Sequence, residues 1–120
     1  MGDRISINFV DGNNYEDRSA TLFAHWGGKN LLQLVSAYLY RLYAEEKGDT
    51  YPLQRKEPGT VFADFVRDLF SIEQRIQSNY YIVPTPRDGD NSDNGHYYIL
   101  LYENTFNITK KISKTKGGKL

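Results

Sequence analysis

The chain has 120 residues, of which 39% are hydrophobic, and its 15 basic and 15 acidic side chains give a formal net charge of zero. This length suits one domain, because two halves would each be too small to bury a stable core. The lack of cysteine excludes disulfides, thiol catalysis and cysteine-ligated zinc, and no apolar run is long enough to span a membrane. We therefore expect a cytoplasmic protein without a membrane partner.

Two runs of alternating residues come first and predict an antiparallel hairpin. Residues 4–10 alternate apolar side chains with polar ones such as Ser6 and Asn8, which is typical of a half-buried strand. Residues 18–25 repeat this period of two. The polar cluster at residues 11–14 between them predicts a loop longer than the tightest hairpin turns.

Two stretches then have the periodicity of amphipathic helices. The first begins near Asn30 as an N-cap and ends before Gly48, and its apolar face is Leu31, Leu34, Val35, Tyr38, Leu39 and Leu42. The second is capped near Thr60, and its apolar stripe is Phe62, Phe65, Leu69, Ile72 and Ile76. Both helices should pack on the sheet.

Strands at residues 80–85 and 97–103 complete a β-β-α-α-β-β order, and residues 106–112 form an optional fifth strand. The predicted fold is α+β, with a mostly antiparallel sheet of four to five strands and two helices on one face. Residues 1–109 form this single domain. Residues 110–120 hold five lysines and no acid, which predicts a flexible basic tail on an acidic body.

The most distinctive motif is the His25-Trp26-Gly27-Gly28 turn between a strand and a helix. A helix start presents free N–H groups and a partial positive charge, so it can hold an anion beside His25. The alternative is architectural: Trp26 fills the edge of the core, and the glycines make a tight turn. The motif is not a P-loop, since the Gly-Lys-Ser/Thr ending is missing.

The polar loop at residues 87–96 resembles the first half of a calcium loop. Asp90, Ser92 and Asn94 have the alternating spacing of oxygen ligands, but Leu101 stands where a bidentate glutamate belongs. A polar hairpin loop is therefore the default reading. We expect no resident cofactor, with a divalent metal as the weaker alternative.

His25 together with His96, and separately Arg55, are further candidates for ligand contacts. His25 and His96 both lie at strand ends, so they would suit a transition metal together with Asp90 or Asp93 if the strands were neighbours. Arg55 is able to bind a phosphate, although a surface ion pair is the usual role of such a residue. No nucleophile elbow or Ser-His-Asp order is present, which disfavours an enzyme.

Paired tyrosines suggest an alternative role in nucleic-acid binding. Tyr80, Tyr81, Tyr97 and Tyr98 lie on two strands that we expect to pair, and exposed rings on a sheet can stack bases. The acidic body disfavours this role, because phosphate contacts supply most of the affinity. The default is that one ring of each pair lies in the core and the other at its edge.

The Met1-Gly2-Asp3-Arg4 opening and the His-Trp-Gly-Gly turn together resemble a family of small uncharacterised proteins of prokaryotes and their viruses. The resemblance spans most of residues 1–109, while the tyrosine-rich first helix and the lysine tail depart from it. It implies a cytoplasmic protein of viral or proviral origin and transfers no catalytic residue.

These observations favour a small binding or interaction protein, monomeric or homodimeric, whose ligand is a protein or a small anion. The alternatives are a histidine-dependent or metal-assisted enzyme acting on a phosphate-containing substrate, and a nucleic-acid binder that uses the lysine tail and surface tyrosines.

Overall fold

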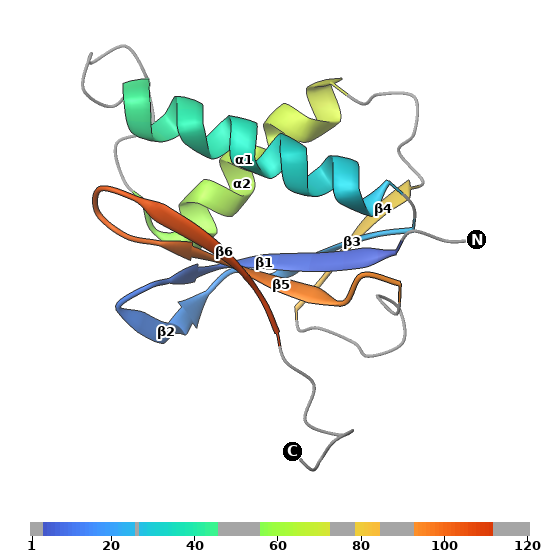
Figure 1. Cartoon of the computed structure of the whole chain (residues 1–120), viewed down its shortest axis with the longest axis horizontal. Coiled ribbons are helices and arrows are strands. Elements are labelled where there is room, and N and C mark those ends of the chain that lie inside the picture. The colour runs from blue at the N-terminus through green and yellow to red at the C-terminus, as the bar shows by residue number, and fades with distance from the viewer. Residues whose placement is uncertain (1–3, 26, 46–55, 73–78, 85–92, 112–120) are drawn as a thin grey trace.

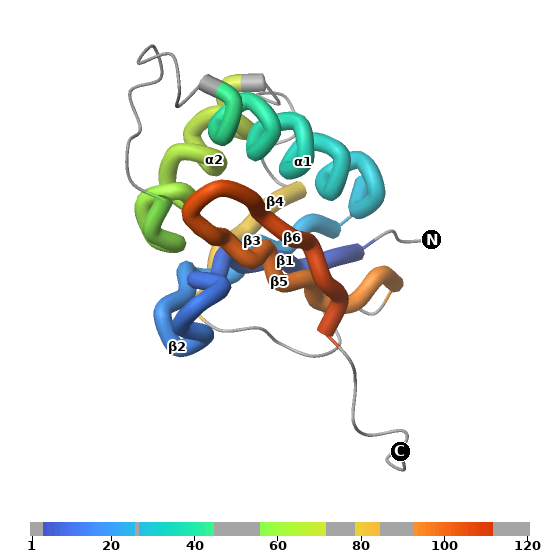
Figure 2. The backbone as a smooth tube through the Cα atoms, turned by 60° about the vertical axis from the view of Figure 1, so that its left-hand side comes forward, coloured from blue at the N-terminus to red at the C-terminus, as the bar shows by residue number. Residues whose placement is uncertain are grey.

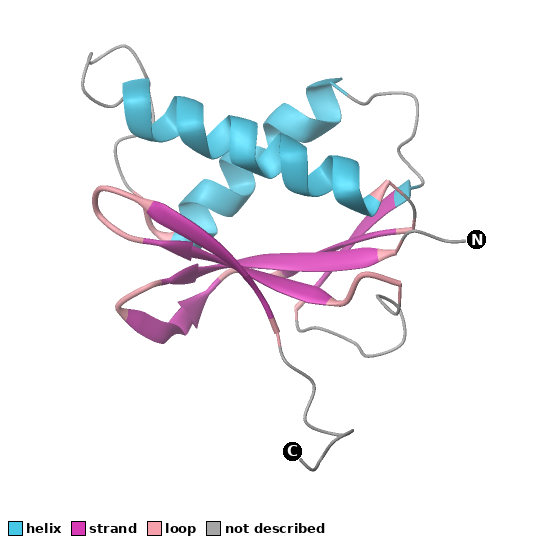
Figure 3. Cartoon of the chain, viewed as in Figure 1, coloured by secondary structure: helices cyan, strands magenta, loops and turns pink. Residues whose placement is uncertain are grey.

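The computed structural model describes residues 4–25, 27–45, 56–72, 79–84 and 93–111. Within them, two helices lie on one side of a twisted sheet (Figures 1 and 3). In chain order the elements are β1 (Ile5–Asp11), β2 (Asn14–Arg18), β3 (Thr21–Ala24), α1 (Gly28–Glu45), α2 (Pro58–Ile72), β4 (Tyr80–Val83), β5 (His96–Leu101) and β6 (Phe106–Lys110). This arrangement confirms the predicted α+β class with both helices on one face.

The strands form one mixed sheet in the order β4-β3-β1-β5-β6, and β2 pairs with the end of β1. β1 is parallel to β5, and every other pair in the described sheet is antiparallel. The sheet is thus mostly antiparallel, as predicted, but it has six strands rather than four or five. The parallel pair is feasible because both helices lie between β1 and β5 in the sequence, which gives a connection long enough to cross over.

The core lies between the helices and one face of the sheet, and Figure 2 shows the same two layers from another side. Ile5, Ile7 and Phe9 are fully buried in it. The Phe9 ring centroid lies 6.1 Å from that of Phe62 and 5.8 Å from that of Phe65. The alternation in β1 and the helical periodicity of α2 therefore meet in one apolar layer.

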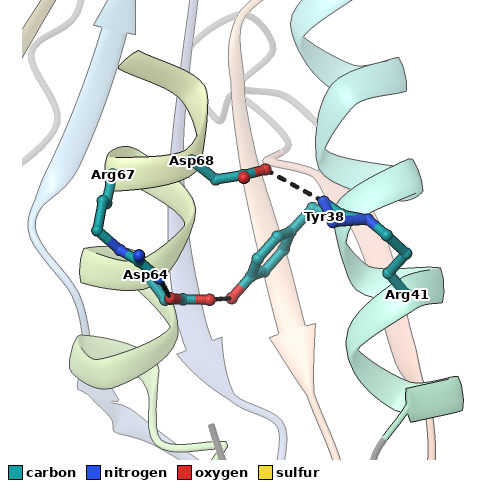
Figure 4. Close-up of polar contacts among 5 residues, drawn as sticks. All are labelled: Tyr38, Arg41, Asp64, Arg67 and Asp68. Atoms are coloured by element: carbon teal, nitrogen blue, oxygen red, sulfur yellow. Dashed lines mark hydrogen bonds and ion pairs between the residues drawn. The ribbon is translucent and has the colours of Figure 1, made fainter. Parts of the chain in front are cut away.

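Polar contacts join the two helices beside this core (Figure 4). The Tyr38 hydroxyl donates to Asp64 Oδ2 at 2.6 Å, and Asp64 also pairs with Arg67 on its own helix. Arg41 Nη2 lies 3.1 Å from Asp68 Oδ2. Because the Tyr38 ring is buried, this side chain contributes both to the core and to the contact between the helices.

The first hairpin is tighter than predicted, and its second strand is interrupted. β1 and β2 pair with Asp11 opposite Asn14, which leaves only two residues in the turn. The Asp11 carboxylate accepts a hydrogen bond from the Asn13 amide at 2.8 Å, which stabilises this short turn. The Ser19 amide donates to the Phe9 carbonyl at 2.8 Å, while Ser19 Oγ accepts from the Phe9 amide at 2.9 Å. A side chain therefore takes the place of one of the two backbone hydrogen bonds before β3 begins.

Both helices begin earlier than predicted. α1 begins at Gly28 rather than after Asn30, because the Leu31 amide already donates to the Gly27 carbonyl at 2.9 Å. α2 begins at Pro58 rather than near Thr60, since proline suits a first helical position where no amide hydrogen is needed. In the described residues, neither helix has the length and apolarity required to cross a bilayer.

The later strands are shorter than predicted or shifted. β4 ends at Val83 and β5 runs from His96 to Leu101, while β6 is the optional strand. The predicted positions Ile76, Thr85 and Ile112 lie outside the described residues.

Candidate functional site

One rim of the sheet brings together most of the described residues of the predicted site. β3 ends where β1 begins, with Ala24 opposite Ile5, and β5 begins one residue pair further along β1. The turn into α1 follows β3 directly. We call the following set the His25 rim: Arg4, His25, Gly27, Gly28 and Lys29.

The turn itself is a strand-to-helix junction. The exposed His25 ring lies 5.2 Å from the ring of Tyr81. Gly27 has a φ of 78°, a left-handed conformation that glycine adopts without strain. A Cβ added to Gly27 would meet no heavy atom within 4 Å, so backbone conformation rather than crowding explains this glycine. Trp26 lies outside the described residues.

Arg4 is held in place at the His25 rim by Asp93. The Arg4 backbone amide donates to Asp93 Oδ2 at 3.0 Å, and Arg4 Nε donates to the same oxygen at 3.2 Å. Both hydrogen bonds lower the pKa of the Asp93 carboxyl, and the one from the Arg4 backbone amide has the larger effect. The Arg4 carbonyl accepts from the Asn94 amide at 2.9 Å and from Asn94 Nδ2 at 3.0 Å.

The lowered pKa of Asp93 predicts a loss of stability in acid. A carboxyl with a lower pKa in the folded state stabilises the fold above its unfolded pKa, and this contribution is lost as the pH falls through the folded pKa. We expect the free energy of unfolding to fall below about pH 4, and Asp93→Asn to reduce that fall modestly, because the group is exposed. Urea unfolding at neutral and acidic pH measures this, and parallel pH profiles for both proteins would contradict it.

The second histidine belongs to a buried polar network on the sheet face opposite the helices. Ser6 Oγ lies 2.7 Å from His96 Nδ1, and Asn8 Oδ1 lies 2.9 Å from His96 Nε2. Ser6, Asn8 and His96 are 0%, 1% and 4% exposed. With Asn8 Oδ1 facing the ring, Nε2 donates to it, and in the neutral ring Nδ1 then accepts from the Ser6 hydroxyl.

This Ser6-His96-Asn8 network has the residue types of an acyl-transfer site but not its accessibility. A nucleophilic hydroxyl must reach the substrate, whereas Ser6 exposes none of its surface. The network therefore acts as a polar part of the core in this conformation. Sequence reasoning missed Ser6 and Asn8, because their alternation with apolar residues indicated a face in water; their polarity in a central strand was the available signal.

Two atoms beside this network are buried without a hydrogen-bond partner. They are Asn8 Nδ2 and Thr21 Oγ1. The β1–β3 register, continued by one pair beyond Ile7 and Leu22, places Asn8 opposite Thr21 on the same face. Rotating the Asn8 amide only exchanges its two ends, so one end stays unpartnered in either orientation.

Substitutions of Thr21 and of Ser6 should affect the free energy of unfolding differently. Thr21→Val keeps the side-chain shape and removes an unpartnered hydroxyl, so the free energy of unfolding should be unchanged or rise by up to about 1 kcal/mol. Ser6→Ala removes the hydroxyl beside His96 Nδ1 and should lower the free energy of unfolding by about 1–3 kcal/mol. Urea unfolding of both variants tests this. A destabilised Thr21→Val protein would mean that the Thr21 hydroxyl is hydrogen-bonded.

The predicted metal sites are only partly within the described residues. Asp90 and Ser92 lie outside them, and Asn94 donates its side-chain amide to the Arg4 carbonyl, just before β1. The described residues contain no group of three or more histidines and carboxylates close enough to hold a metal.

The two histidines lie at the same rim but on strands separated by β1. Two strand spacings put their backbones at least about 10 Å apart. Both ring nitrogens of His96 are already hydrogen-bonded to Ser6 and Asn8, so binding a metal there would break one of these bonds. Arg55, the phosphate candidate, lies outside the described residues.

The tyrosine pairs divide between the two faces of the sheet. Tyr80 lies in the core under the helices and Tyr97 packs against it, while the half-buried Tyr81 and Tyr98 lie on the opposite face. The predicted pairing of their strands is wrong, because β3 and β1 separate β4 from β5. Tyr81 stacks on Phe23 with ring centroids 5.0 Å apart, so one face of its ring is already covered.

No protein-family model, curated protein or solved structure matches this chain. The resemblance to the family with the His-Trp-Gly-Gly turn therefore stays a prediction.

Proposed function

We propose that this chain is a non-catalytic binding protein that holds a small anionic ligand at the His25 rim. The observation that carries the proposal is the different placement of the two histidines. His96 is buried in a hydrogen-bonded network, whereas His25 is exposed beside the start of a helix. An exposed imidazole next to the partial positive charge of a helix start is a chemically suitable anion contact.

The charges around the His25 rim support this ligand class. The first turn of α1 contains no acidic residue and exposes Lys29, which forms no ion pair in the described residues. The ion pair with Asp93 neutralises Arg4, which leaves Lys29 and the partial positive charge of the helix start. The rim is therefore positive although the rest of residues 1–109 is acidic.

Catalysis is the weaker proposal because the described part of the chain does not expose a nucleophile beside a base. Its Ser-His pair is Ser6 and His96, and both are buried. A binding role requires only exposed donors and positive charge. We also propose that the protein is cytoplasmic, since a chain without cysteine needs no oxidising compartment.

An NMR titration tests the proposed function. Inorganic phosphate should shift the backbone amides of Gly27, Gly28 and Lys29 in a saturable way, and adenosine monophosphate shows whether a base adds affinity. Lys29→Glu should weaken phosphate binding about tenfold, because it places a negative charge at the helix start. Lys110→Glu, the same change on β6, is the matched control and should leave binding unchanged. Unshifted rim amides in millimolar phosphate would refute the proposal.

A further inference from the structure

The outer edge of β6 is an unpaired edge with an aromatic side chain beside it. β6 pairs with β5, and no other described strand pairs with it. Such an edge presents free N–H and C=O groups to another chain. Tyr40 of α1 is 69% exposed, and its ring centroid lies 5.3 Å from that of Phe106 at the start of β6. Phe106 and Ile108 pack on the core yet stay half-exposed.

The far end of the same strand is positively charged. Lys110 ends β6 and Lys111 follows it, and neither forms an ion pair in the described residues. Residues 112–120 add three lysines and no acid in the sequence. The edge of β6 therefore combines unpaired backbone groups, apolar side chains and uncompensated positive charge.

We propose that the outer edge of β6 receives an extended acidic segment of a partner protein as an additional antiparallel strand. Backbone pairing along β6 provides the affinity, as in other cases of strand addition. Alternate side chains of the segment pack on Tyr40, Phe106 and Ile108, because side chains of neighbouring strands share a face. Its carboxylates lie on the other face, beside Lys111, because Lys110 shares the face of Phe106 and Ile108.

The charge distribution favours an acidic partner over a second copy of this chain. A second β6 strand would add another Lys110 and Lys111 to this edge and no acid, because β6 contains no carboxylate. An acidic segment neutralises them instead. This surface is distinct from the His25 rim, since it lies on an outer strand of the sheet and requires no anion at the helix start.

The test uses the full chain and a capped peptide of about eight residues that alternates valine and glutamate. Titration should shift the amides of Asn107, Ile108 and Thr109 and slow the hydrogen exchange of Ile108 and Lys110, whose N–H groups face away from β5. A peptide with lysine in place of glutamate should bind at least about tenfold more weakly. A valine–glutamate peptide N-methylated on its pairing edge should not bind, since it cannot form the strand hydrogen bonds.

Matched variants test whether the peptide binds at the outer edge of β6. Lys111→Glu and Tyr40→Ala should each weaken peptide binding about tenfold, whereas Lys29→Glu and Tyr15→Ala, equivalent changes at other exposed positions, should not. Unchanged far-UV circular dichroism shows that each variant is folded. Equal binding of the lysine or N-methylated peptide would overturn the proposal. So would a dimer in sedimentation experiments that protects the same β6 amides.

Discussion

Replacing Phe9 by alanine should lower the free energy of unfolding by about 3–5 kcal/mol. Phe9 is fully buried in the central strand, and its ring contacts Phe62 and Phe65 of α2. Its loss removes the apolar contact that joins the sheet to the second helix and leaves a cavity that neighbouring rings fill only in part. Urea unfolding followed by circular dichroism measures the change.

Tyr15→Ala is the control for Phe9→Ala, because it also removes an aromatic ring from a strand. Tyr15 is 56% exposed on β2, so this change should alter the free energy of unfolding by no more than about 0.5 kcal/mol. A cost below about 1 kcal/mol for Phe9→Ala would show that the sheet and α2 are not packed as described. A domain of this size is stable by only about 5–15 kcal/mol, so the expected loss is a large fraction of the total.

Removing the His96 side chain should be nearly as costly, at about 3 kcal/mol or more. His96→Ala leaves a cavity in a buried region and removes the hydrogen-bond partner of both the Ser6 hydroxyl and Asn8 Oδ1. His96→Gln keeps a hydrogen-bond donor and an acceptor in a side chain longer than that of alanine. It should therefore lower the free energy of unfolding less than His96→Ala does. Urea unfolding of both variants measures these differences.

His25→Ala provides the contrast that separates architecture from binding. His25 is exposed, so its loss should change stability by about 0.5 kcal/mol or less while reducing the phosphate response of the His25 rim. Equal destabilisation by His25→Ala and His96→Ala would show that the two histidines do not differ in role. The proposed binding site would then lose the observation that carries it.

The hydrophobic periodicity predicts the α+β class, because it depends on local geometry. Alternation in residues 4–10 predicts β1 and the burial of Ile5 and Phe9, and the helical spacing of Leu31 and Leu42 predicts the buried face of α1. These patterns hold because both elements pack an apolar face on the same core.

The strand partners and element ends were less predictable, because contacts between distant residues decide them. The parallel pairing of β1 with β5 joins Ser6 to His96 across 90 positions, and no local pattern contains that information. Likewise, the Ser19 hydroxyl replaces one backbone acceptor by accepting from the Phe9 amide, at the point where a continuously alternating run divides into β2 and β3. α1 starts earlier than predicted because the carbonyl of Gly27, rather than that of Asn30, accepts the first helical hydrogen bond.

In the candidate site, too, local patterns predict some features and distant contacts decide others. The His25 turn is visible in the sequence because two glycines separate a strand pattern from a helix pattern. The Ser6-His96-Asn8 network is not visible, since its members are brought together only when β5 pairs with β1. The unpartnered Asn8 and Thr21 atoms likewise result from the antiparallel pairing of β1 with β3.

Local sequence patterns therefore indicate most of the strands and helices, the apolar faces that pack between the helices and the sheet, and the glycine turn beside His25. Only the tertiary structure decided that His96 is buried while His25 is exposed, and that β6 is an edge with free lysines at its end. The physical reason is that burial and charge compensation depend on strand order. Neighbouring strands supply the contacts that bury a side chain or neutralise its charge, and no local pattern specifies those neighbours.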